Sequence, residues 1–169
     1  SKVLLTIPPQ LGYPAGFSPD ASKLLVVSPT LVRVVDLMTM SPLVELRGLS
    51  GAFHNAEFSK RGDLILAADE NRICVWKSQT GKLLCEIAAN AQEVHFNSND
   101  SRITGVILPN RACAWDTITG NAIGVGVKNN GEITGASFHG DGKKVVVATH
   151  NSASARLWDI DSGRMVADT

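Results

Sequence analysis

Short apolar segments separated by polar turns run along the whole chain of 169 residues. One representative stretch holds four of them, from Ala52 to Phe58, Leu64 to Ala68, Arg72 to Trp76 and Leu83 to Ala88. Each is rich in Val, Ile, Leu and aromatic residues and is bounded by Gly, Asp, Asn or Ser, as strands joined by tight turns are. No segment carries a sustained helical period. The pattern therefore predicts an all-β fold of short antiparallel strands.

Two sequence markers return about every 40 residues, which indicates four repeats. The first is a Phe followed by a polar turn, and the second is a Trp followed five residues later by a Gly. Val35 holds the Trp place in the first repeat, and Met40 stands where its Gly should be, so we expect that turn to differ. The markers are Phe17, Phe58, Phe96 and Phe138, then Trp76, Trp115 and Trp158, then Gly81, Gly120 and Gly163.

The second apolar segment of the repeats is nearly free of polar residues. Leu24 to Val27, Leu64 to Ala68 and Val145 to Ala148 are the clearest cases. Such a run is typical of a strand that is buried on both faces. Only the neighbouring repeats can supply that cover, so the sequence predicts four-stranded antiparallel sheets packed face to face, as the blades of a β-propeller are.

At this point the sequence resembles the WD-repeat, or beta-transducin repeat, propeller family. The resemblance rests on Trp115-Asp116 and Trp158-Asp159, the variant Trp76-Lys77, the turns that end at Gly120 and Gly163, and Phe17-Ser-Pro-Asp. It implies four-stranded blades, a central channel and a scaffolding role in a multiprotein assembly.

The chain departs from the family in its polar residues. Family members often carry a Gly-His pair whose His bonds to a turn Asp, a strand Ser and the Trp, but here Gly48 precedes Leu49. Glu70 falls six residues before Trp76, where the turn acid is expected, and no acid takes that place before Trp115. We therefore expect apolar packing to hold the blades.

The repeat boundaries predict one propeller segment over 1–169, with an outer strand at 1–7 and units at 8–47, 48–88, 89–127 and 128–169. A family propeller has about seven blades, so we expect a part of a longer ring. A head-to-tail oligomer and a self-closed ring of four blades are the alternatives. Unpaired blade edges would also allow self-association.

Net charge and apolar run length argue against nucleic acid and membrane partners, and the cysteine content indicates the compartment. Sixteen basic and sixteen acidic residues cancel, so no overall field favours nucleic acid, and no apolar run is long enough to cross a membrane. Three cysteines without a CxxC pattern indicate reduced thiols. We expect a cytoplasmic or nuclear protein that binds proteins or peptides.

Catalytic and cofactor motifs are missing from the sequence. The four histidines have no metal-ligand spacing, and neither a nucleophile elbow nor a phosphate-binding glycine loop occurs. Acids such as Asp69 lie in turns, where they bind their own backbone. We therefore expect no cofactor, no metal and no enzyme activity. The alternative is a small-ligand or catalytic site in the central channel, where Glu57, Glu93 and His95 are the polar residues on offer.

Two arginines stand at matched positions four residues before a Trp. Arg72 follows Asn71 and Arg111 follows Asn110, each at the turn between the second and third strands. Guanidinium groups one blade apart would bind an acidic or phosphorylated peptide. A solvated turn with long polar side chains is the simpler alternative.

The loops that lead into the first strands open on the same face of the predicted blades. Tyr13, Phe53, His54 and Glu93 are the expected contacts there, and Phe53 fits the core equally well. The sequence thus favours a non-catalytic scaffold that binds other proteins through this loop face. A purely structural repeat within a larger chain is a further alternative.

Overall fold

The computed structural model describes residues 12–29, 31–49, 53, 55–139, 142–149 and 155–168. Within these ranges the regular structure consists of strands, and no helix that could cross a membrane is found there. The outer strand expected at 1–7 and the expected contact residue His54 lie outside the described residues.

The described strands form four antiparallel four-stranded sheets, each made from one continuous stretch of chain. We call each sheet a blade. The first contains β1 (Tyr13–Phe17), β2 (Lys23–Ser28), β3 (Leu31–Asp36) and β4 (Pro42–Leu46); the second β5 (Asn55–Phe58), β6 (Leu64–Ala68), β7 (Arg72–Lys77) and β8 (Leu83–Ala88); the third β9 (Ala91–Phe96), β10 (Arg102–Ile107), β11 (Arg111–Asp116) and β12 (Ala122–Lys128); the fourth β13 (Ile133–Phe138), β14 (Lys144–Thr149), β15 (Ala155–Asp159) and β16 (Met165–Asp168).

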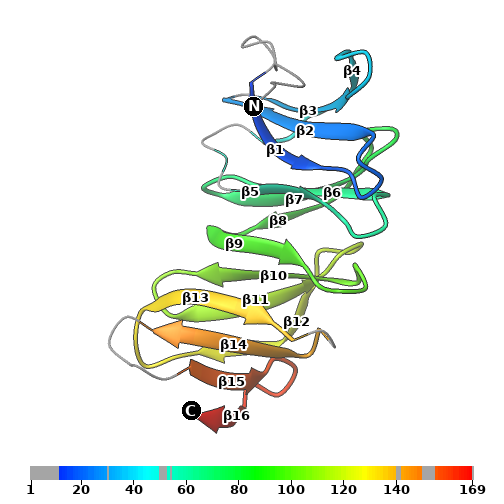
Figure 1. Ribbon diagram of the computed structural model, residues 1–169. Helices are drawn as coiled ribbons and strands as arrows, with labels where there is room; N and C mark the ends of the chain where they lie inside the picture. The colour runs from blue at the N-terminus through cyan, green and yellow to red at the C-terminus, as the bar shows by residue number, and fades with distance from the viewer. Residues whose placement is uncertain are drawn as a thin grey trace, which may run out of the picture.

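The blades stack in sequence order, and the first and fourth lie at opposite ends of the stack (Figure 1). Strand β5 contacts β1 on one side and β9 on the other, and β10 contacts β13. The four blades are therefore an all-β propeller arrangement that does not close on itself.

Three apolar layers lie between neighbouring blades, one for each pair, and a fourth cluster around Leu24, Val26 and Val35 lies on the other face of the first blade. Strand β6 lies between two of the layers. Its residues Ile65 and Ala67 pack toward the first blade, whereas Leu64, Leu66 and Ala68 pack toward the third. Because side chains alternate along a strand, this all-apolar run is buried on both faces, as the sequence predicted.

The second strand of the first blade follows that rule, since Leu24, Leu25 and Val26 are all buried, but that of the fourth blade does not. On β14, Val145 and Val147 are fully buried, but Val146 is 38 % exposed because no described blade covers its face. The Phe markers behave in the same way. Phe58, Phe96 and Phe138 each pack into the layer shared with the preceding blade, whereas Phe17 has no described blade before it and is 64 % exposed.

The tight turn after the third strand is the same in all four blades, which corrects the expectation for the first. Gly81, Gly120 and Gly163 have φ between 67° and 70°, and Met40 adopts the same left-handed conformation at 55°. The Met40 N–H donates to the Asp36 carbonyl at 2.8 Å, just as the glycine N–H groups bond four residues back. Met40 adopts this less favourable conformation so that the turn keeps its shape.

The three tryptophans pack in successive layers but differ in their polar contacts. Trp76 is 1 % exposed, and its indole N–H donates to the Arg47 carbonyl at 3.0 Å. Trp115 packs in the layer between the second and third blades, and Trp158 in the next layer. Among the described residues, the buried indole nitrogen of Trp158 has no hydrogen-bond partner.

Candidate functional site

One edge of every blade carries both the turn between its second and third strands and the link to the next blade, because neighbouring strands are antiparallel. We call this edge the loop face. Asn71 and Asn110 hold equivalent positions on it. The Asn71 carbonyl accepts a hydrogen bond from the Ala89 N–H at 3.0 Å, and the Asn110 carbonyl accepts one from the Asn129 N–H at 2.9 Å. Their backbones thus tie the turn to the chain that leaves the fourth strand.

Tyr13 and Phe53 lie against the same hollow between the first and second blades. The hollow has a volume of about 360 Å³ and is also lined by Val27, Asn55 and Ala56. Tyr13 is 77 % exposed, whereas Phe53 is half-buried and also touches the apolar layer beneath. Phe53 therefore belongs to both the core and the surface. Tyr13 and Phe53 line one preformed recess.

Arg72 and Arg111 begin strands β7 and β11, but they have different surroundings. Arg72 lies between two carboxylates, 3.7 Å from Asp69 and 3.4 Å from Glu86. Arg111 is exposed and directly opposite Lys128 on β12. Within the part of the chain that the structure describes, neither Arg111 nor Lys128 forms an ion pair.

The turn acid of the second blade is Asp69, which corrects the expectation that Glu70 takes this place. The Asp69 side chain is 2 % exposed and accepts hydrogen bonds from the N–H groups of Asn71 and Arg72, both at 2.8 Å. Glu70 is exposed. An Asp reaches its own turn backbone more easily than the longer Glu does.

The inner-strand carboxylates connect successive blades. Glu57 on β5 accepts a hydrogen bond from the Phe96 N–H at 2.7 Å through one oxygen, and its other oxygen lies 2.9 Å from Nδ1 of His95. Glu93 lies at a bulge of β9 with φ of 50°, and its carboxylate accepts from the Ala136 N–H at 3.2 Å. The sequence predicted Glu93 as a partner contact, and the hydrogen bond between Glu93 and the next blade was not predicted.

His95 lies beside a cavity with a volume of about 420 Å³. The hydrogen bond that Nδ1 of His95 donates to the Glu57 carboxylate raises the pKa of His95; partial burial opposes this, and the charges of Glu57 and Glu93 add to it. Lys60, Ser98, Ser137 and His139 also line the cavity. With Nδ1 engaged by Glu57, Nε2 is the ring nitrogen left for a ligand.

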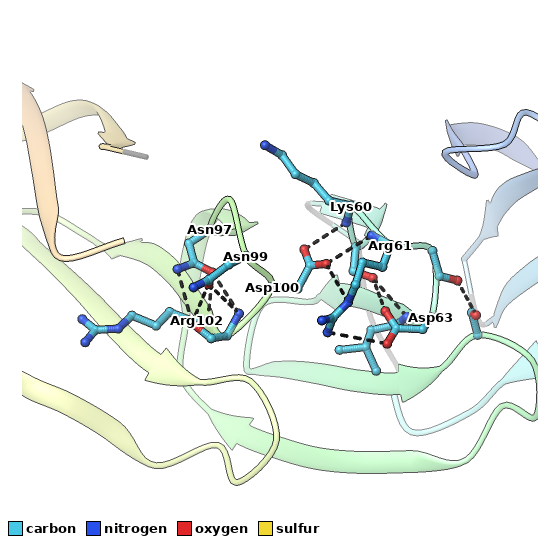
Figure 2. A network of polar contacts seen from close by, with 12 residues as sticks. Lys60, Arg61, Asp63, Asn97, Asn99, Asp100 and Arg102 are labelled. Carbon is cyan, nitrogen blue, oxygen red and sulfur yellow. Dashed lines mark hydrogen bonds and ion pairs between the residues drawn. The ribbon is translucent and has the colours of Figure 1, made fainter. Parts of the chain in front are cut away.

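The opposite edge of the blades has a polar network of its own (Figure 2). The Asp100 carboxylate of the third blade accepts hydrogen bonds from the backbone N–H groups of Lys60, at 2.9 Å, and Arg61, at 3.2 Å. On the next interface Arg102 lies 2.8 Å from Asp161. The network joins three blades, and no pattern in the sequence indicated it.

Nucleophile and metal chemistry find little support in the described residues. Burial raises the pKa of the Cys74 thiol to about 12 and also raises those of Cys85 and Cys113. These thiols are therefore protonated at neutral pH. Among the residues that the structure describes, no three His, Cys, Asp or Glu side chains come together to hold a metal ion.

No protein-family model and no curated protein matches the sequence. Solved structures do match. The β-propeller domain of Cps50 (Swd1) from Myceliophteria thermophila superposes with a TM-score of 0.84 at 16% identity, over 99% of this chain and 57% of that one. The computationally designed Ika8 protein superposes with a TM-score of 0.71 at 22% identity, over 88% of this chain and 46% of that one.

The chain thus spans about half the length of the structures it matches. At these identities the likeness shows the fold alone, and it agrees with the four described sheets. The protein has a β-propeller fold.

Proposed function

We propose that the chain is a WD-repeat scaffold that binds other proteins at its loop face and forms part of a longer propeller in the cytoplasm or nucleus. The repeat markers and the likeness to a propeller domain support this. The observation that carries it is the recess between Tyr13 and Phe53. A large exposed aromatic residue beside a preformed hollow is typical of a protein-binding surface, because it buries much area with little rearrangement.

The inner-strand carboxylates support a role without catalysis. Both oxygens of Glu57 are engaged by the neighbouring strand, and Glu93 is bound to the next blade. A general base must reach the proton that it removes, and these groups are committed to holding blades together.

The test is to immobilise the chain, expose it to cell extract and quantify the captured proteins against a Tyr13→Ala variant. Met38→Ala is the matched control, since Met38 is 91 % exposed and lies in a turn at the opposite edge. We expect at least one captured protein to fall about tenfold with Tyr13→Ala and to stay unchanged with Met38→Ala. The same proteins in the same amounts on all three chains would contradict the proposal.

A second candidate function is the binding of a small anion at the cavity beside His95. Its support is the combination of Lys60, His95 and His139 around one cavity of about 420 Å³. A titration with inorganic phosphate, followed by NMR at pH 6 and pH 8, tests it. Tighter binding at pH 6, lost in His95→Gln, would support it; shifts of equal size in the variant would contradict it.

A further inference from the structure

Arginine on the third strand meets a carboxylate on the outer strand in three of the four described blades. Arg33 lies 3.3 Å from Glu45, Arg72 lies 3.4 Å from Glu86, and Arg156 lies 3.2 Å from Asp168. Arg33 and Glu45 are direct partners across the strands, as are Arg156 and Asp168. Arg33 and Arg156 stand two residues before the Trp position of their blades, whereas Arg72 stands four residues before it, so these ion pairs occupy two different places on the outer rim.

In the third blade the arginine that matches Arg72 has no such carboxylate among the described residues. This arginine, Arg111, faces Lys128, so two cations stand directly opposite each other on neighbouring strands. Like charges in this arrangement destabilise a sheet. Both side chains are exposed, and neither has an ion pair within the described residues. The third blade therefore has two positive charges side by side, whereas the matching Arg72 of the second blade is neutralised by Asp69 and Glu86.

The third blade has a glycine bulge and a cavity at the place where the second blade has its outer-strand acid, Glu86. The outer strand of the third blade runs Gly124-Val125-Gly126 opposite Cys113, where the second blade places Glu86 opposite Cys74. Both glycines have left-handed backbones and form a bulge. Next to it is a cavity of about 200 Å³, lined by Arg111 and otherwise by apolar groups such as Ala88, Ile107, Ile123 and Val125.

We propose that this rim site binds an acidic segment of a partner protein: Arg111 and Lys128 hold a side-chain oxyanion, and a small aliphatic neighbour of that side chain fills the cavity. The other blades show what an arginine at this rim binds, and here the anion has to come from a second molecule. The inference rests on the proposed function and names the chemistry of one partner. The oxyanion is a carboxylate or the phosphate of a modified side chain.

The test uses a blocked seven-residue peptide with one central glutamate between two valines, together with its glutamine and phosphoserine analogues. Binding is followed by the backbone amide signals of the chain. We expect shifts at residues 111–113 and 124–128, with a Kd for the glutamate peptide at least tenfold below that of the glutamine peptide. The phosphoserine peptide shows which oxyanion the site prefers.

Three variants make the test specific. Arg111→Gln weakens binding of the glutamate peptide at least tenfold. Lys128→Glu supplies the anion from within the chain, so it abolishes binding and raises Tm by about 2 °C. The control is Lys77→Gln combined with Lys82→Gln, which removes two positive charges beside Asp63, at the edge of the second blade opposite the loop face. This double variant leaves binding unchanged.

Several results would overturn the inference. They are an equal Kd for the glutamate and glutamine peptides, no shifts at these residues with any peptide, or shifts there caused by a single-stranded oligonucleotide alone. A protein captured through Tyr13 that binds the Arg111→Gln chain equally well would also overturn it, while the proposed function would stand.

Discussion

Glu57 on one blade accepts a hydrogen bond from the backbone N–H of Phe96 on the next, with 2.7 Å between oxygen and nitrogen. This bond crosses from the first strand of the second blade to that of the third, beside the ion pair with His95. Asp100, in the turn that follows β9, makes a comparable bond to the backbone of the second blade. Polar contacts between blades thus accompany the apolar layers, although the sequence lacks the polar network that is common in WD-repeat proteins.

The Glu57 bond predicts a measurable loss of stability. Glu57→Ala should lower the free energy of unfolding by about 1–2 kcal/mol, because it leaves the Phe96 N–H without its partner. Glu70→Ala removes the same group from an exposed turn and should cost less than about 0.5 kcal/mol. Urea unfolding of the two variants checks this. Equal losses in both would show that the bond contributes nothing.

The pair of Glu57 and His95 predicts a pH dependence. The pKa of His95 is raised in the folded chain above its ordinary value of 6.5, chiefly by the hydrogen bond to Glu57. The resulting stabilisation is full below pH 6.5 and is lost as the pH rises through the folded pKa. The urea midpoint should therefore fall more between pH 5.5 and pH 8.5 in the natural chain than in His95→Gln. An identical fall in both chains is the contrary result.

The tryptophans predict unequal costs for the same substitution. Trp76→Phe removes the donor to the Arg47 carbonyl, whereas Trp158→Phe removes a buried N–H that has no partner in the described part of the chain. We expect Trp76→Phe to cost about 1 kcal/mol more, since a broken hydrogen bond is unfavourable and the removal of an unpaired polar group is not. Equilibrium unfolding measures both. A larger loss for Trp158→Phe would contradict this reading.

The bulge of β12 predicts a strict need for glycine. A Cβ at Gly124 would lie 2.3 Å from the Ile160 carbonyl oxygen, and the backbone φ there is 66°. Gly124→Ala should therefore cost at least about 2 kcal/mol. Gly135→Ala is the control, because a Cβ there meets nothing within 4 Å. Thermal unfolding distinguishes them, and a tolerated Gly124→Ala would mean that the bulge is not held as described.

Strands and their period could be predicted from the sequence because both depend on local chemistry. The burial of β6 on both faces and the glycine turns at Gly81 and Gly120 follow from residue type alone. Met40 could not be predicted, since the turn it adopts is set by the strands on either side rather than by its own preference. The exposure of Phe17 and Val146 depends on which blades are present beside them.

Less of the candidate site than of the fold could be predicted from the sequence. Arg72 and Arg111 looked equivalent because both precede a Trp by four residues, but their partners come from outer strands whose register the sequence does not state. Glu93 looked like a surface contact, and its bond to Ala136 requires the position of the next blade. Interactions between repeats are set by packing distances, which repeat spacing alone does not give.

A double-mutant cycle across Arg111 and Lys128 tests most directly the claim that the third blade lacks the acid its neighbours have. The free energy of unfolding is measured for the natural chain, Arg111→Gln, Lys128→Glu and the double variant. We predict that Lys128→Glu stabilises the chain by about 0.5 kcal/mol, and that this gain disappears when Arg111 is replaced. A loss of stability in Lys128→Glu, or a gain independent of Arg111, would contradict the account.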